Sequence, residues 1–183
     1  MKLVVTVLLA ALASLCGADE LPWYVGTSGG LLLPGCGNSL RRAAEVSVRA
    51  GVYAGDFVAW EVEGVCAPNA SCHDGHDALS GVAARGLFHL AGLEFYDRLF
   101  GCERFDPFAT LGVATRFGPV HAFADDSHRT ATGPVAGLGA FYHLTENLDL
   151  RFDAQAQLAC DSPCGMLFSA CVGLQWNFGG GGE

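Results

Sequence analysis

The sequence predicts an all-β fold, an eight-stranded antiparallel up-and-down β-barrel that crosses a membrane. Hydrophobic residues make up 51% of the 183 residues. Beyond the first 20 residues, however, no apolar run reaches the roughly 18 residues that a membrane-spanning helix requires. Apolar and polar residues instead alternate along most of the chain, which is the periodicity of strands. Apolar content spread over alternating segments is typical of strands that face lipid on one side.

The N-terminal residues have the pattern of a secretory signal. A short basic start at Met1-Lys2 precedes an apolar run over residues 3–15, and small residues follow up to Ala18, where we expect cleavage. The sequence therefore predicts three parts: a signal peptide over residues 1–18, a barrel over residues 19–178, and a flexible glycine-rich tail over residues 179–183.

Two segments near the C-terminus carry the strongest alternation. From Leu148 to Cys160, and again from Met166 to Phe178, apolar side chains occupy nearly every second position and polar or small ones occupy most of the others. A helix would scatter these groups around its axis. The predicted strands are Trp23–Leu33, Ala44–Val52, Phe57–Val65, Val82–Gly92, Pro107–Phe117, Val135–Leu144, Leu148–Cys160 and Met166–Phe178, the first with an ambiguous register. Their number is even, as in bacterial single-chain barrels.

The connections between these strands alternate in length, with two exceptions: the link near residues 93–105 is long, and the last one, residues 161–163, is short. Residues 54–56 and 145–147 form tight turns, whereas residues 34–43, 66–79 and 118–132 are longer and richer in Gly, Pro, Asp and His. Outer-membrane barrels have short periplasmic turns and long external loops. We therefore expect both chain termini to be periplasmic.

Alternation alone does not decide which face meets lipid. A soluble lipocalin-like binding barrel hides its apolar face in the lumen, whereas a membrane barrel turns it outward. Aromatic residues on the apolar face favour the membrane barrel, because interfacial girdles use them. The residues expected to face lipid are Trp60, Phe88, Phe152, Phe168, Trp176 and Phe178.

The polar face carries charges of both signs in nearly equal number. A buried lumen requires such pairing, because a lone buried charge costs several kcal/mol. The residues expected to form an inward ion-pair network are Glu45, Arg49, Glu61, Glu63, Arg85, Arg116, Asp149, Arg151 and Asp153. An eight-stranded barrel is only wide enough inside for its own side chains, so we favour a salt-bridged plug over a gated pore.

Two stretches resemble the OmpA-like and OmpX-like family of small outer-membrane barrels. Residues Gly133–Arg151 are similar to its strand, tight turn and strand unit, and Gly173–Phe178 is similar to its C-terminal assembly signal. The resemblance implies an integral protein of a Gram-negative outer membrane. Its partners would be outer-membrane lipids and the barrel-assembly machinery, which would recognise Trp176 and Phe178. The chain departs from the family in that residues 179–183 follow the last aromatic residue.

Seven cysteines remain after signal cleavage, and an exported chain can oxidise them. Close spacing predicts disulfides between Cys66 and Cys72 and between Cys160 and Cys164, while Cys36, Cys102 and Cys171 are left unassigned.

Two segments rich in His and Asp, residues 72–77 and 121–128, could bind zinc or copper. Solvated outer loops explain them better, so we expect no metal and no cofactor.

The charge pattern limits the function. The formal net charge is −9 and Lys2 is the one lysine, which argues against a nucleic-acid partner. A lipid-modifying enzyme is an alternative, but His89 and His143 belong to no Ser-His pattern and no catalytic residue is expected. The sequence favours a non-enzymatic structural or surface-interaction role of the adhesion or receptor kind, with an external ligand that it does not identify.

Overall fold

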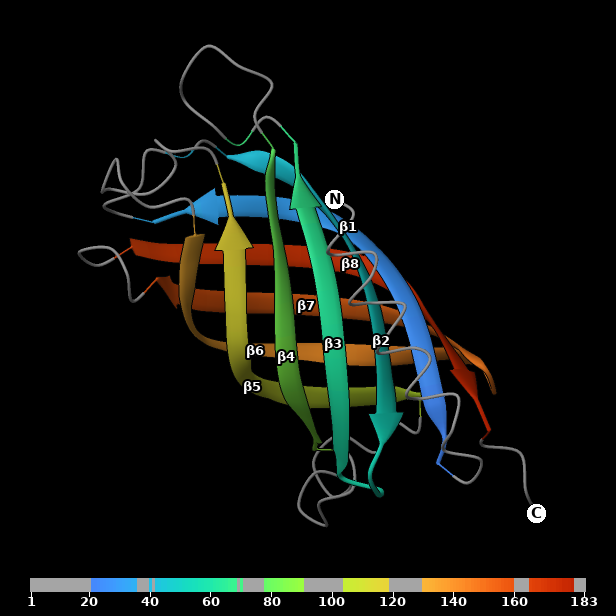
Figure 1. The fold of residues 1–183 in the computed structure, drawn as a ribbon. Coiled ribbons are helices and arrows are strands. Elements are labelled where there is room, and N and C mark those ends of the chain that lie inside the picture. The colour runs from blue at the N-terminus through green and yellow to red at the C-terminus, as the bar shows by residue number, and fades with distance from the viewer. Residues whose placement is uncertain are drawn as a thin grey trace.

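The chain folds into one closed barrel of eight antiparallel strands (Figure 1). The strands of this computed structural model are β1 (Trp23–Pro34), β2 (Ala43–Tyr53), β3 (Val58–Ala67), β4 (Leu79–His89), β5 (Phe105–Phe117), β6 (Thr130–Thr145), β7 (Leu148–Ala159) and β8 (Gly165–Phe178). The structure describes residues 21–35, 40, 42–68, 70, 78–90, 104–118, 130–159 and 165–179. Among these residues, no helix is long and apolar enough to cross a membrane.

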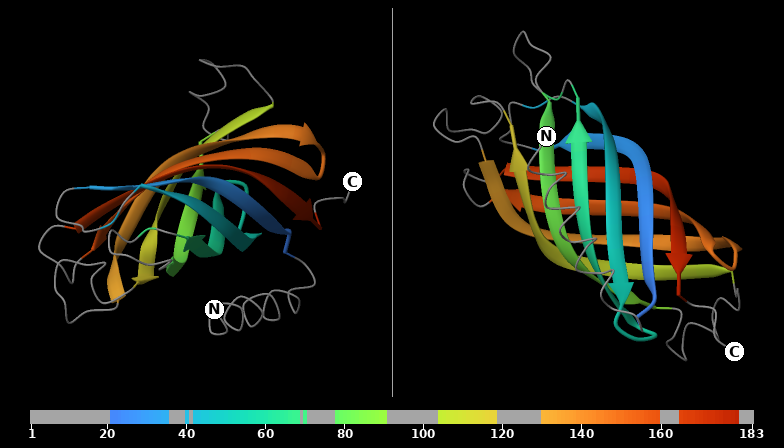
Figure 2. Two further views of the ribbon diagram at one scale, coloured as in Figure 1. Left: turned by 90° about the horizontal axis from the view of Figure 1, so that it is seen from above. Right: turned by 45° about the vertical axis from the view of Figure 1, so that its right-hand side comes forward.

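Each strand pairs with its sequence neighbours, and β1 pairs with β8 to close the sheet. In Figure 1, β2, β3 and β4 cross β6, β7 and β8 at a steep angle, which is the strand tilt that barrel closure requires. Figure 2 shows β1 lying between β2 and β8 from two further sides. The predicted eight-stranded up-and-down barrel is therefore confirmed.

The strands agree with the predicted ranges to within two residues except at both ends of β4 and at the start of β6. β4 ends at His89 rather than Gly92, because Leu90 already lies in a bend. β4 begins at Leu79 rather than Val82, because Leu79 and Ser80 pair with the last residues of β3. β6 begins at Thr130 rather than Val135, because Thr130–Pro134 continue the ladder with β5 through Gly133 and Pro134. The sequence suggested a loop there, since Gly and Pro usually interrupt strands.

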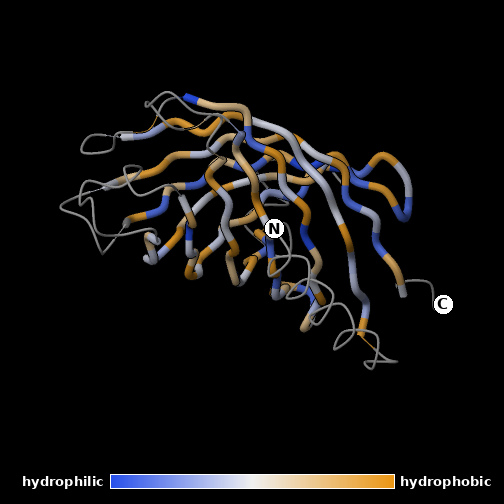
Figure 3. Tube along the Cα trace, turned by 45° about the horizontal axis from the view of Figure 1, so that its top comes forward, coloured by the Kyte–Doolittle hydropathy of each residue, from blue (hydrophilic) through white to orange (hydrophobic). Residues whose placement is uncertain are grey.

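The polar face of the sheet lines the interior and the apolar face forms the outer wall. Along β7, Asp149, Arg151 and Asp153 are buried, whereas Phe152 is 41% exposed and Leu158 is 47% exposed. Hydrophobic and hydrophilic residues alternate along much of the sheet in Figure 3. This arrangement is the reverse of a lipocalin-like barrel, whose apolar face lines the lumen.

The barrel has two distinct ends. At the end that we call the terminal rim, β1 begins, β8 ends, and the short links Ala54–Phe57 and Glu146–Asn147 join neighbouring strands. At the opposite end, the loop rim, β1, β3, β5 and β7 end. The links that leave from the loop rim lie largely outside the described residues.

Inward-facing glycines make room for the largest interior side chains. A Cβ on Gly51 would lie 2.3 Å from the Tyr24 ring, and a Cβ on Gly139 would lie 2.3 Å from the Phe108 ring. Both distances are well inside van der Waals contact. The interior can therefore hold these aromatic rings only because the facing positions carry no side chain, which gives part of the reason for 25 glycines in the chain.

Candidate functional site: a charged interior

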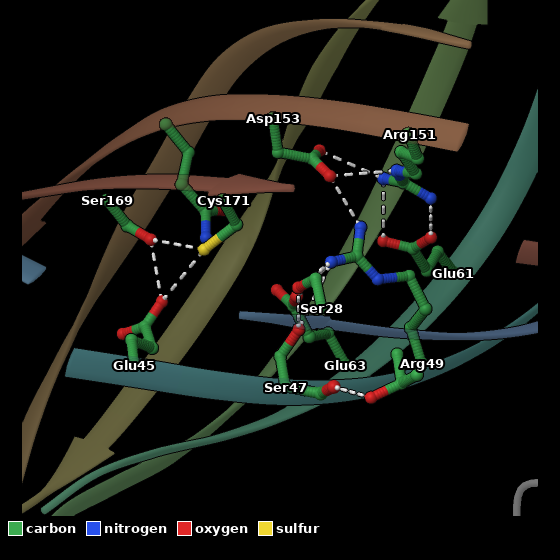
Figure 4. Close-up of polar contacts among 12 residues, drawn as sticks. Ser28, Glu45, Ser47, Arg49, Glu61, Glu63, Arg151, Asp153, Ser169 and Cys171 are labelled. Atoms are coloured by element: carbon green, nitrogen blue, oxygen red, sulfur yellow. Dashed lines mark hydrogen bonds and ion pairs between the residues drawn. The ribbon is translucent and has the colours of Figure 1, made fainter. Parts of the chain in front are cut away.

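Arg151 of β7 lies at the centre of the interior. Its guanidinium lies 2.5 Å from Glu61 Oε2 on β3 and donates to Asp153 on its own strand over 2.9 Å (Figure 4). The same group lies over the rings of Phe108 and Phe141, with its central carbon 4.8 and 5.2 Å from the ring centroids. Carboxylates and aromatic faces both favour a planar cation, and together they fix this one in place.

Arg49 of β2 crosses the interior to reach the same carboxylates. Its Nη1 lies 2.6 Å from Asp153 on β7, and its Nη2 lies 3.2 Å from Glu63 on β3. Nη2 also donates to the hydroxyls of Ser28 and Ser47. Because β2 and β7 are not neighbours in the sheet, this pair links opposite walls of the barrel.

Arg85 of β4 completes the central cluster. Its Nη2 forms ion pairs with both Glu61 and Glu63, at 2.9 Å to the latter, and its Nη1 donates to Gln155. Glu61 and Arg85 are direct partners in the β3–β4 register, so a short cross-strand pair anchors the longer contacts.

A smaller cluster lies apart from the central one. Arg116 of β5 pairs with Glu45 of β2 at 2.8 Å, again across the barrel. The other oxygen of Glu45 accepts from Ser169 over 2.6 Å and lies 3.8 Å from the Cys171 thiol. Gln157 accepts from Arg116 and donates to the carbonyl oxygens of Ala114 and Ala131, so this cluster also ties in β7.

These two clusters balance their charges. The four arginines, Arg49, Arg85, Arg116 and Arg151, face the four carboxylates of Glu45, Glu61, Glu63 and Asp153, and every one of these residues is 8% exposed or less. A cavity of about 10 Å³ remains beside Arg116, Glu63 and Gln155. That is about the room one water molecule needs, so side chains fill the space between the clusters.

The ninth predicted network residue, Asp149, is buried but pairs with no arginine among the described residues. It accepts from His143 Nδ1 over 2.7 Å and from the amide of Asn177 over 2.6 Å. Asp149 therefore belongs to a separate group at the terminal rim. A second pair of the same kind lies nearby, where His89 Nδ1 is 2.5 Å from Asp106 Oδ2. Each of these histidine bonds is to a carboxylate and not to a Ser or Thr hydroxyl.

The predicted lipid-facing aromatic residues all lie on the outer wall. Trp60 is 58% exposed, and Phe88, Phe152, Phe168, Trp176 and Phe178 are between 39% and 42% exposed. Phe178 stacks on Trp23 with ring centroids 4.2 Å apart. Since Trp23 begins β1 and Phe178 ends β8, this stack lies on the seam that closes the barrel.

The predicted disulfides find no support in the described residues. Cys66 is a free thiol in this structure rather than half of a bridge, and Cys171 is also free. The other predicted partners, Cys72, Cys160 and Cys164, lie outside the described residues, as do the signal peptide and all of the tail but Gly179.

The His- and Asp-rich segments 72–77 and 121–128 also lie outside the described residues. Among the described residues, no three His, Cys, Asp or Glu side chains are placed to hold a metal.

Sequence reasoning missed most of the uncharged members of the network. Tyr24 donates to Glu61 over 3.0 Å, and Gln175 accepts from Arg151 over 3.1 Å. Alternation on β8 placed Gln175 inside, so that residue could have been found. Tyr24 could not, because the glycine-rich first strand has no clear alternation.

These features define a class: small closed β-barrels with an apolar outer wall and a polar interior filled by side chains. Solved outer-membrane barrels share the architecture. Neisserial surface protein A matches with a TM-score of 0.58 and 11% identity over 86% of this chain and 96% of its own. Outer membrane protein W of E. coli matches with a TM-score of 0.54 and 9% identity over 87% and 98%. Ail, the attachment invasion locus protein of Yersinia pestis, matches with a TM-score of 0.53 and 8% identity over 86% and 97%.

No protein-family model matches the chain, and no curated protein matches it in sequence. At these identities the likeness concerns the fold alone. The small outer-membrane barrel architecture that the resemblance implied is thereby confirmed.

Proposed function

We propose that the chain is an integral outer-membrane barrel with a closed interior and a non-enzymatic structural or surface-interaction role. The observation that carries this proposal is the pairing of an apolar outer wall with a buried, charge-balanced interior. The wall suits lipid, because its exposed side chains are apolar. The interior does not suit transport, because four arginines and four carboxylates fill it, and three of these arginines form ion pairs between non-adjacent strands.

The expected orientation places the terminal rim in the periplasm and the loop rim at the cell surface. Two of the three links at the terminal rim are short, which supports this orientation, since periplasmic turns of such barrels are short. The third link, between His89 and Phe105, is long. The partners are outer-membrane lipids around the wall and the barrel-assembly machinery. That machinery would act on Trp176 and Phe178 before Phe178 stacks on Trp23 at the seam.

A closed interior leaves the external loops as the surface through which the protein would act. The name of Ail refers to attachment and invasion, and that of Neisserial surface protein A refers to a surface location. Those names describe the neighbours. For this chain they favour a contact role for the loops over a channel, with a ligand still to be identified.

Electrical recording on planar lipid bilayers tests the closed interior. The refolded full-length barrel should give no steady single-channel current at neutral pH and moderate salt. Arg116→Ala combined with Glu45→Ala removes one bridge together with its counter-charge and should raise leak events. Steady, uniform conductance steps from the unmodified protein would contradict the plug.

Attachment assays test the surface role. Bacteria that express the full chain should adhere to a host-cell layer more than cells carrying the empty vector. Replacement of residues 119–129 by a Gly-Ser linker should reduce adhesion while the barrel still resists unfolding in detergent. Equal adhesion of all three strains would remove the support for a contact role of that loop.

A further inference from the structure

The terminal rim contains a pocket whose described lining includes none of the interior arginines. Its volume is about 520 Å³, a size typical of small-molecule sites. The described residues that line it include Tyr53, His89, Asp106, Phe141, Glu146 and Asp149. Three of them, His89, Phe141 and Asp149, are at most 8% exposed.

The lining is rich in hydrogen-bond acceptors and poor in cations. Asp56, Asp106, Glu146 and Asp149 contribute carboxylates, and no arginine is among the described lining residues. Arg104, which directly precedes β5 at this rim, is not part of the lining either. The described lining of the pocket is therefore acidic, whereas the charges of the barrel interior are balanced.

The two histidines add acceptors of their own. A carboxylate can only accept, so His89 Nδ1 donates to Asp106 and His143 Nδ1 donates to Asp149. In the neutral imidazole this leaves each Nε2 as an acceptor. In the imidazolium form, both ring nitrogens would instead be donors.

Two buried polar atoms in this lining lack a partner. His89 is 92% buried and its Nε2 makes no hydrogen bond, and Asp106 Oδ1 makes none either. An unpaired buried acceptor is destabilising, so a donor supplied from outside would recover that cost. Both residues line the pocket, and an N–H donor would satisfy Asp106 Oδ1 and, on the neutral ring, His89 Nε2 as well.

We propose that the terminal-rim pocket binds a small organic polyamine. Ammonium groups supply only donors and positive charge, which matches a lining of carboxylates and acceptor nitrogens. The ring of Tyr53 flanks the histidine and suits the cation and its methylene groups. A metal ion fits less well, because no three described ligands are placed to coordinate one.

Calorimetric titration of the full-length protein, refolded in neutral detergent micelles, tests the proposal with spermidine as the probe. Sodium chloride keeps the ionic strength constant, because unspecific attraction to an acidic rim is screened by salt. Saturable binding is expected. Asp106→Asn and Glu146→Gln should each weaken it by about tenfold or more, the effect of losing one charged hydrogen bond. Asn147→Gln changes an exposed side chain in the same turn as Glu146 and should leave the affinity unchanged.

Three results would overturn the proposal. The first is no saturable heat with spermidine. The second is equal affinity of the unmodified protein and both charge variants, each shown to be folded by its faster gel mobility before boiling. The third is tighter binding of zinc or magnesium chloride than of spermidine, which would assign the pocket to a metal ion.

Discussion

At the scale of single residues, Arg151 is the most constrained side chain of the barrel. It is 1% exposed and contacts two carboxylates and two aromatic rings. Arg151→Leu keeps much of the volume but leaves Glu61 and Asp153 with less compensation. Breaking a buried pair in this way costs about 3–5 kcal/mol. The midpoint of urea unfolding in lipid vesicles should fall accordingly.

Arg42→Leu is the matched control, because Arg42 is an exposed arginine that immediately precedes β2. Surface substitutions usually change stability by about 0.5 kcal/mol or less, so its midpoint should stay near that of the unmodified protein. Equal midpoints for both variants would show that the central ion pairs contribute no stability.

Glycine positions give a second residue-scale prediction. In Gly139→Val the new side chain would begin 2.3 Å from the Phe108 ring and 2.4 Å from the carbonyl oxygen of Phe152. Phe108 would have to leave its contact with Arg151, so the barrel should fail to refold or should lose about 1–3 kcal/mol, the usual cost of overpacking. Gly29→Val is the control, because the nearest atom to a Cβ there lies 4.0 Å away. Refolding yield in detergent checks both, and similar yields would contradict this packing.

At the scale of elements, a strand was predicted more accurately when its two faces differ more completely in polarity. β7 was predicted to within one residue, because acidic, basic and amide side chains alternate with apolar ones along its whole length. The register of β1 could not be predicted, because its glycines give no alternation of polar and apolar side chains. Only the pairing of β1 with β2 and β8 shows that Tyr24, Ser28 and Leu32 face inward. The first residues of β4 and β6 are strand residues because they pair with β3 and β5. The sequence of a single segment does not reveal such pairing.

The same limit applies to the site. Alternation along each strand identified the inward charges, and all nine are buried. It could not say which charges meet, because Arg49–Asp153 and Arg116–Glu45 join strands that are distant in sequence and not adjacent in the sheet. For this reason Asp149 was predicted to pair with the arginines, whereas in the structure it accepts hydrogen bonds from His143 and Asn177.

Phe152 tests the outward register of β7. Phe152 is 41% exposed between the buried Arg151 and Asp153, near the middle of the strand. Phe152→Arg puts a cation against lipid, which costs about 2–4 kcal/mol near the bilayer midplane. We expect little assembled protein in the outer-membrane fraction, and near-normal assembly of the control Phe152→Leu. Full assembly of the arginine variant would mean that this face does not meet the membrane core.

At the scale of the whole molecule, the network joins walls that the sheet alone leaves independent. Every backbone ladder links neighbouring strands, but the arginines connect β2 to β7, β3 to β7 and β2 to β5. Such contacts resist flattening of the barrel, because separating the walls would expose unpaired charges. An apolar interior would resist flattening only through packing.

Closure and orientation can be tested together through the described turn Glu146–Asn147, which lies at the terminal rim. A short epitope inserted there should be reached by antibody only after the outer membrane is permeabilised, because short turns are expected in the periplasm. The same protein should run faster on a detergent gel before boiling than after it, since a closed barrel keeps its strands paired in detergent. Antibody binding to intact cells, with the mobility shift retained, would reverse the orientation while leaving the fold in place. A missing shift with the epitope protein in the soluble periplasm would contradict membrane insertion itself.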